Sequence, residues 1–184
     1  MTLFINCCVR KDSRTERLAR AALTKLGGEV CEVSLYNEEL RPLSAETLSK
    51  RTELIKTGSF SDKMFDYAKQ FAAADNIVIA APFWDLSFPA PLKTYIENIY
   101  ITGIVSEYDT NGMPYGLCRA KRLWYVTTAG GPYIPEYSYG YIESLAKNFF
   151  GIAETRLIYA ELLDVDGSDP EKLLQDAITS VLNS

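Results

Sequence analysis

Five short apolar runs, each separated from the next by at least one helical pattern, constrain the fold of this chain more than any other feature. The runs are Leu3 to Cys8, Val30 to Leu35, Ile77 to Ala80, Leu123 to Thr127 and Thr155 to Leu162. Their lengths suit buried strands, and the helical segments between them would return the chain to the start of the next parallel strand. The pattern therefore predicts an α/β fold in which helices wrap a parallel sheet of five strands.

The helical segments carry their own boundary signals. The first is expected to begin near Ser13 or Thr15 and to end at Gly27-Gly28, and the last has Asp169 as N-cap with Pro170 in its first turn. Between the second and third strands Gly58 and Ser59 split the helical region into 44–56 and a second helix from position 61; a further helix is expected near 139–149. No repeat or linker divides the chain, so we expect one domain over residues 1–184.

Composition narrows the class of protein. With 184 residues, 47% hydrophobic and 23% charged, the chain has the make-up of one globular domain with a sizeable core. A formal charge of -5 argues against nucleic acid or an anionic membrane as partner. No apolar run has the length of a membrane span, and no cleavable leader precedes the first strand. We expect a cytoplasmic protein whose partner is a small molecule.

The absence of one residue type removes whole classes of chemistry. The chain has no histidine, which excludes Ser-His-Asp hydrolases, Cys-His proteases and most catalytic zinc sites. Of the four cysteines, Cys7 and Cys8 are adjacent and Cys31 and Cys118 are isolated, so neither a disulfide framework nor a metal site is expected. Any chemistry is therefore expected to depend on a borrowed cofactor.

The loop after the first strand has the inventory of a phosphate site. In an open α/β sheet, ligands bind beyond the carboxyl ends of the strands. Here that segment, Cys7 to Thr15, offers the hydroxyls of Ser13 and Thr15, the guanidinium groups of Arg10 and Arg14, and the free amides of a helix start. Ser13 or Thr15 could equally be a simple N-cap. The loop has neither GxGxxG nor GxxxxGK[ST], so a nucleoside triphosphate site is not expected.

The loops after the third and fourth predicted strands suit a flat ring. Pro82, Phe83 and Trp84 offer planar apolar surface, although Phe83 and Trp84 could instead plug the top of the core. In the segment 127–133, Gly130-Gly131 allows backbone amides to approach a ligand edge, although a plain turn would use the same pair. Together the three loops match the phosphate, ring face and ring edge of flavin mononucleotide (FMN).

Three motifs in this order, RKDSRT, PFWDLSFPAPLK and TTAGGPY, are similar to those of the flavodoxin-like NAD(P)H:quinone oxidoreductase and FMN-dependent azoreductase family. The resemblance covers nearly the whole chain, and the middle motif is the specific one. It implies a flavodoxin-like, doubly wound sheet with strand order 2-1-3-4-5 and helices on both faces. It also implies a homodimer with FMN near the subunit interface, hydride transfer from NADH or NADPH, and reduction of quinones, azo dyes or related acceptors.

Carried over by position, the resemblance assigns Ser13, Arg14 and Thr15 to the FMN phosphate, the segment 83–86 to the flavin and the segment 128–131 to its pyrimidine edge. The full set of candidate cofactor-binding residues is Cys8, Arg10, Ser13, Arg14, Thr15, Pro82, Phe83, Trp84, Asp85, Leu86, Thr128, Ala129, Gly130, Gly131 and Tyr133. The hydride would pass through N5 of the flavin, so no side chain is predicted to be catalytic. Tyr133 or Tyr137 could donate a proton to the acceptor, but both fit better as aromatic walls.

Three positions depart from the family pattern: Asp85 stands where asparagine is common, Leu86 where an aromatic is common, and Ala129 where arginine is frequent. The Asp85 carboxylate would oppose negative charge on a reduced ring unless it faces solvent or a donor. With these three substitutions, the motifs do not identify the electron acceptor. An FMN-binding electron carrier that does not turn over nicotinamide is the alternative function.

One further segment, the turn-rich stretch from Thr102 to Cys118, has no assigned role. It could cover the pocket, contact a second subunit or form a surface hairpin, and its Asn111-Gly112 pair is a good turn signal.

Overall fold

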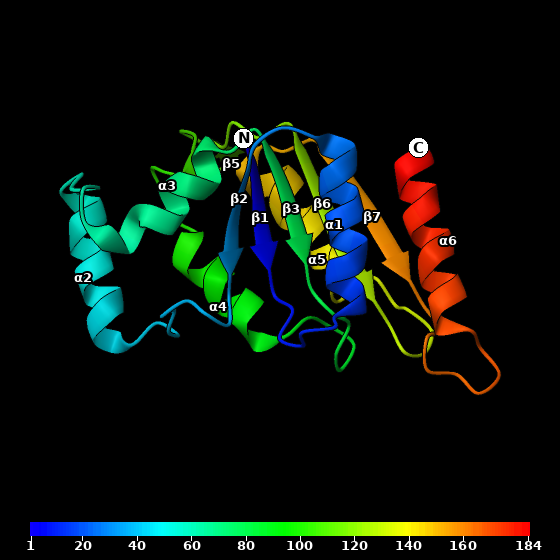
Figure 1. Cartoon of the computed structure of the whole chain (residues 1–184). Helices are drawn as coiled ribbons and strands as arrows, with labels where there is room; N and C mark the ends of the chain where they lie inside the picture. Colours follow the sequence, from blue (N-terminus) through cyan, green and yellow to red (C-terminus); the bar gives the residue numbers. More distant parts are fainter.

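The computed structural model describes all 184 residues and has a five-stranded parallel sheet at its centre (Figure 1). The strands are β1 (Thr2–Asn6), β2 (Val30–Ser34), β3 (Asn76–Ala80), β6 (Arg122–Thr128) and β7 (Glu154–Ala160). They lie in the order β2-β1-β3-β6-β7, so the predicted order 2-1-3-4-5 is confirmed for the parallel strands. Strand order reverses between β1 and β3, and the carboxyl ends of all five strands lie at the lower edge of the sheet in Figure 1.

Helices cover both faces of the sheet, as predicted. They are α1 (Arg14–Leu26), α2 (Ala45–Lys56), α3 (Asp66–Ala73), α4 (Ala90–Ile99), α5 (Tyr139–Leu145) and α6 (Pro170–Asn183). Alternate strand residues face opposite layers: Phe4 packs in the core beneath α1 and α6, whereas Leu3 and Ile5 pack in the core beneath α3, α4 and α5. The inner strands are buried on both sides, which explains their continuous apolar sequences.

The predicted helix boundaries hold where capping residues define them. The Ser13 hydroxyl accepts a hydrogen bond from the Glu16 amide at the start of α1, and the helix ends at Gly27, whose φ is 66°. The Asp169 carboxylate accepts from the Lys172 amide at the start of α6. Capping satisfies amides that the first helical turn leaves without partners, so these signals are local and readable from sequence.

Two helical segments differ from the prediction. The helix expected from position 61 starts later, because the Asp62 carboxylate caps the Met64 amide, and it begins as a 3-10 turn, η1 (Lys63–Phe65), before α3. The helix expected over 139–149 is α5 followed by a π-helical segment, η2 (Ala146–Phe150), which ends at Gly151 with φ of 75°.

The segment 102–118 forms a two-stranded antiparallel hairpin of β4 (Ser106–Tyr108) and β5 (Pro114–Gly116). It lies near the amino ends of the parallel strands, at the top of Figure 1, where the Lys121 amide donates to the carbonyl of Asp75. The hairpin alternative is therefore confirmed and the pocket-cover alternative is wrong, because the ligand edge is at the other end of the sheet.

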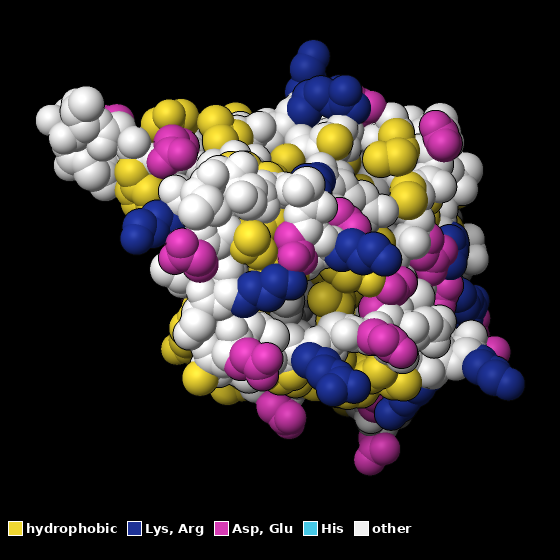
Figure 2. Space-filling view, turned by 90° about the vertical axis from the view of Figure 1, so that its left-hand side faces the viewer, with side chains coloured by type: hydrophobic (Ala, Val, Ile, Leu, Met, Phe, Trp, Pro, Cys, Tyr) yellow, Lys and Arg dark blue, Asp and Glu magenta, His cyan; other side chains and the backbone are white.

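The surface shows no concentration of one charge on the side that carries α2 and α4. Figure 2 shows acidic, basic and apolar side chains intermixed there, around a hollow with apolar side chains at its base.

Helix α2 has no buried residue and stands away from the sheet. None of the helices combines the length and the apolar character needed to cross a bilayer.

Candidate flavin site

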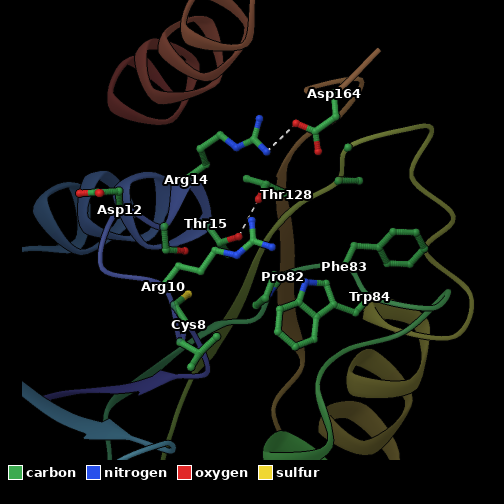
Figure 3. A pocket seen from close by; sticks show the side chains of 14 residues that line it. Cys8, Arg10, Asp12, Arg14, Thr15, Pro82, Phe83, Trp84, Thr128 and Asp164 are labelled. Carbon is green, nitrogen blue, oxygen red and sulfur yellow. Dashed lines mark hydrogen bonds and ion pairs between the residues drawn. The ribbon is translucent and has the colours of Figure 1, made fainter. Parts of the chain in front are cut away.

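A cleft of about 160 Å³ lies at the carboxyl edge of the sheet, between the loops that follow β1, β3, β6 and β7 (Figure 3). Its lining consists of Cys8, Val9, Arg10, Asp12, Ser13, Arg14, Thr15, Pro82, Phe83, Trp84, Thr128, Ala129, Gly130 and Asp164. The three loops singled out in the sequence therefore meet at one place. This is the position where the topology of a doubly wound sheet places its ligand.

The start of α1 provides hydrogen-bond donors to the cleft. Ser13 is the N-cap, with its hydroxyl oxygen 3.2 Å from the Glu16 amide, so the cap reading of Ser13 is correct. The next two amides, those of Arg14 and Thr15, donate to no group of the chain. They lie at the positive end of a 13-residue helix and line the cleft, which suits an anion. Capping and anion binding are thus compatible at this loop.

The two arginines of this loop are placed differently. Arg10 is exposed, points into the cleft in Figure 3 and forms no ion pair with the chain. Arg14 donates to the Asp164 carboxylate at 2.8 Å and to the Leu163 carbonyl at 3.1 Å. Its guanidinium ties the start of α1 to the loop after β7, so Arg10 is the cation with no protein partner.

The floor of the cleft is polar and uncharged. The hydroxyls of Thr15 and Thr128 lie 2.6 Å apart and are buried, which joins α1 to the end of β6 (Figure 3). Cys8 is half-buried beside them, and burial raises the pKa of its thiol to about 11. The thiol is therefore protonated at neutral pH and adds no negative charge to the cleft.

The aromatic rim is a tight turn rather than a plug of the core. Trp84 and Ser87 exchange two backbone hydrogen bonds of 3.0 and 2.8 Å, and the residues between them, Asp85 and Leu86, have φ of 50° and 66°. Positive φ at both central positions is the requirement of a type I′ turn. Trp84 is 38% exposed and directed into the cleft in Figure 3, so it is not a core residue.

Phe83 points away from the cleft centre in Figure 3, and its ring packs edge-on against Tyr133 at 4.9 Å between centroids. The Tyr133 hydroxyl in turn lies 2.9 Å from the Ser138 hydroxyl, and burial raises the pKa of Tyr133. Tyr133 therefore supports the aromatic rim from behind. This placement agrees with an aromatic wall.

The two glycines of the Gly130-Gly131 segment share free backbone amides but differ in their surroundings. Neither glycine amide donates to a group of the chain, so both remain available to a ligand. A Cβ on Gly130, however, would lie 3.2 Å from the Asp164 Cβ and 3.1 Å from its Cγ, and would overlap the carboxylate. Gly130 thus makes room for the neighbouring loop, whereas Gly131 has open space around it.

Most of the predicted cofactor-binding residues line the cleft, and four do not: Asp85, Leu86, Gly131 and Tyr133. Asp85 lies exposed at the tip of the Trp84–Ser87 turn and forms no hydrogen bond or ion pair with the chain. The prediction missed three lining residues, Val9, Asp12 and Asp164. Asp164 could have been found, because it closely follows the carboxyl end of the fifth predicted strand.

The fold and the site together define a doubly wound α/β protein of the flavodoxin-like class. Its cleft, which offers donors for an anion and an exposed aromatic side chain, lies where the strand order of the sheet reverses. Residues 1–183 match the model of a family described by its flavodoxin-like fold, and the chain belongs to that family.

Two relatives and one solved structure show what the chain is similar to. An FMN-dependent NADH:quinone oxidoreductase of Coprothermobacter proteolyticus is 34% identical over 179 residues, covering 91% of this chain and 88% of the relative. FMN-dependent NADH:quinone oxidoreductase 2 of Clostridium acetobutylicum is 39% identical, covering 84% and 78%. The crystal structure of an FMN-dependent NADH-azoreductase of Bacillus anthracis in complex with FMN superposes with a TM-score of 0.83 at 25% identity, covering 99% and 95%.

Proposed function

We propose that this chain is an FMN-dependent oxidoreductase that takes hydride from NADH or NADPH and reduces quinones, azo compounds or similar acceptors. The observation that carries the proposal is the convergence of anion donors, an exposed indole and the free amide of Gly130 in one cleft. The names of the relatives support it, because they describe FMN-dependent quinone oxidoreductases and an FMN-dependent azoreductase.

The phosphate of FMN fits the donor set at the start of α1. The amides of Arg14 and Thr15 and the guanidinium of Arg10 have no competing acceptor in the chain, and the Ser13 hydroxyl adds a donor next to the Cys8 thiol. A hydrogen bond to a charged group contributes about 1.5–3 kcal/mol, whereas the helix dipole contributes about 0.3–1 kcal/mol. The direct donors therefore set most of the affinity.

The ring end of the site is formed by the Trp84 indole and the Gly130 amide, and the free amide of Gly131 follows just outside the lining of the cleft. When bound, FMN would supply the hydride chemistry at N5, and no side chain is assigned a catalytic role. The protein would hold the ring by its face and edge and orient it toward the open side of the cleft. A 160 Å³ cleft is too small to enclose a whole flavin, so the ring would lie partly outside it.

We further propose that residues 1–184 act as one FMN-binding domain in the cytoplasm, as a homodimer with the flavin near the interface. A second groove, of about 510 Å³, adjoins the Trp84–Ser87 turn and includes Phe88, Tyr137 and Tyr141. Tyr137 is 65% exposed and Leu86 is 50% exposed. Apolar side chains clustered beside a ligand site favour burial by a partner. A monomeric mass by light scattering for the FMN-loaded protein would contradict the dimer.

The first test is whether the purified protein holds flavin. We expect a yellow protein that releases FMN on denaturation. Trp84→Ala should lower FMN retention more than thermal stability, because the indole is exposed and lines the cleft. Tyr115→Ala is the matched control, since Tyr115 is an exposed aromatic on the distant β5. A colourless protein that takes up no added FMN would refute the function; equal losses in retention and stability would make Trp84 a structural residue.

The second test separates an enzyme from an electron carrier. With NADH or NADPH and an added quinone, the proposed enzyme sustains nicotinamide oxidation over many turnovers. A carrier would bind FMN and show no such steady rate.

A further inference from the structure

Two arginines reach the phosphate end of the cleft, but one of them is already paired. The Arg14 guanidinium is 27% exposed and contacts the Asp164 carboxylate at 2.8 Å (Figure 3). Arg10 has no carboxylate partner. An incoming phosphate therefore meets one free cation and one that is neutralised by an acid.

The position of Asp164 is fixed by backbone contacts. Its amide donates to the Gly130 carbonyl at 2.8 Å, and the preceding residue, Leu163, donates to the Ala129 carbonyl at 3.3 Å. The missing Cβ of Gly130 provides the space that the Asp164 carboxylate occupies. The acid is thus held on the cleft wall by the joined loops after β6 and β7, and a rotation of Arg14 alone would not remove it.

The charges of the lining cancel. Its ionisable acids and bases are Arg10, Arg14, Asp12 and Asp164, two cations and two anions, so the formal charge is zero. Helix amides bind phosphate without a cation, and an unpaired arginine strengthens that binding. Here the amides supply the geometry, while half of the positive charge is cancelled at the point of contact.

We propose that Asp164 is a specificity-determining residue that limits how strongly the cleft distinguishes a phosphorylated flavin from one without phosphate. This inference rests on the proposed function, since it concerns the FMN phosphate. Asp164 repels the incoming dianion and competes for Arg14. Its charge thereby weakens binding of the phosphate more than binding of the uncharged ring, and keeps FMN exchangeable.

Asp164→Asn isolates the charge from the geometry. The asparagine side-chain oxygen can still accept the hydrogen bond from Arg14, and the backbone bonds of residues 163 and 164 do not depend on the side chain. The substitution makes the lining one unit more positive and leaves the loops joined. The removal of the negative charge should therefore change phosphate affinity more than any shift of the residue 164 side chain does.

The test measures FMN and riboflavin affinity of the full-length protein freed of flavin, by quenching of flavin fluorescence. We expect Asp164→Asn to tighten FMN binding about three- to tenfold at low salt, with a smaller effect at high salt, and to leave riboflavin within about twofold. Asp166→Asn removes the same charge from an exposed acid outside the cleft and should change neither affinity by more than about twofold. Arg14→Gln should weaken FMN only, and the double variant Arg14→Gln/Asp164→Asn should return close to wild type.

The possible outcomes are distinct. Unchanged or weaker FMN binding by Asp164→Asn, or an equal change for riboflavin, would overturn the role of Asp164 while leaving FMN binding intact. A wild-type protein that binds neither flavin would instead refute the proposed function itself, and this inference with it.

Discussion

Gly116→Ala should destabilise the protein strongly, because β5 meets η2 backbone to backbone. A Cβ added at Gly116 would overlap the Gly151 nitrogen and the Phe150 carbonyl group, far inside the 3.4 Å at which ordinary contact begins. A Cβ on Gly151 would likewise lie 3.1 Å from the Gly116 Cα. The atoms on both sides belong to the main chain, so no side-chain rotation can relieve the overlap.

The expected loss in the free energy of unfolding follows from the backbone atoms that must move to admit the new methyl group. Overpacking by one methyl group in a tight site costs about 1–3 kcal/mol, and a clash with fixed backbone belongs at the upper end, near 3 kcal/mol. For a chain of this size, about 1 kcal/mol corresponds to about 2–4 °C in Tm, so we expect a drop of about 6–12 °C. The hairpin is distant from the cleft, so FMN affinity of the folded variant should stay near wild type.

Thermal and urea unfolding of the flavin-free protein measure the effect. Gly131→Ala serves as control, because a Cβ there has no neighbour within 4 Å and the residue has no positive φ. It should change the free energy of unfolding by less than about 0.5 kcal/mol. If Gly116→Ala costs less than about 1 kcal/mol, the hairpin moves freely against η2 and the reasoning from close approach is wrong.

Two further predictions concern the flavin rim and acid stability. Leu86→Asn should raise stability by about 0.5–1 kcal/mol, since leucine is strained at φ of 66° and, at 50% exposure, loses little burial; an unchanged or lower Tm would contradict this. Lys147, with hydrogen bonds from Thr155 and Tyr139, holds the pKa of Glu143 below its ordinary value of 4.5. The ionised Glu143 carboxylate therefore contributes its full stabilisation above that value and loses it as pH falls through the folded pKa, so Glu143→Gln should destabilise more at about pH 7 than at about pH 3. Equal costs in urea unfolding at both pH values would refute the linkage.

Much of the fold was predictable because its signals are local. The caps Ser13 and Asp169 satisfy amides within their own first turn, and the apolar runs are continuous because β1 and β3 are buried on both faces. The topology then brings the loop ends together without further information. This is why three separate weak motifs could be assigned to one site.

The remainder depends on contacts between distant segments. The role of Gly130 could not be foreseen, because its neighbour Asp164 is set by the pairing of β6 with β7. Leu86 carries no turn signal, and only the backbone bonds between Trp84 and Ser87 reveal its left-handed conformation. The resemblance likewise assigned Arg14 to the phosphate, and no local signal indicated that its guanidinium pairs with Asp164.

The two ends of the site therefore differ in how strongly their ligand contacts depend on the side chains present. At the proposed phosphate end the main donors would be the amides of Arg14 and Thr15, which α1 fixes whatever side chains those positions carry. At the proposed ring end the contacts would come from an exposed turn, whose tip residues, Asp85 and Leu86, pack against nothing essential to the sheet. Substitutions there can change the surroundings of a flavin ring at little cost in folding. Differences in acceptor between related chains should therefore arise from this turn, while the phosphate end determines that an anion is bound at all.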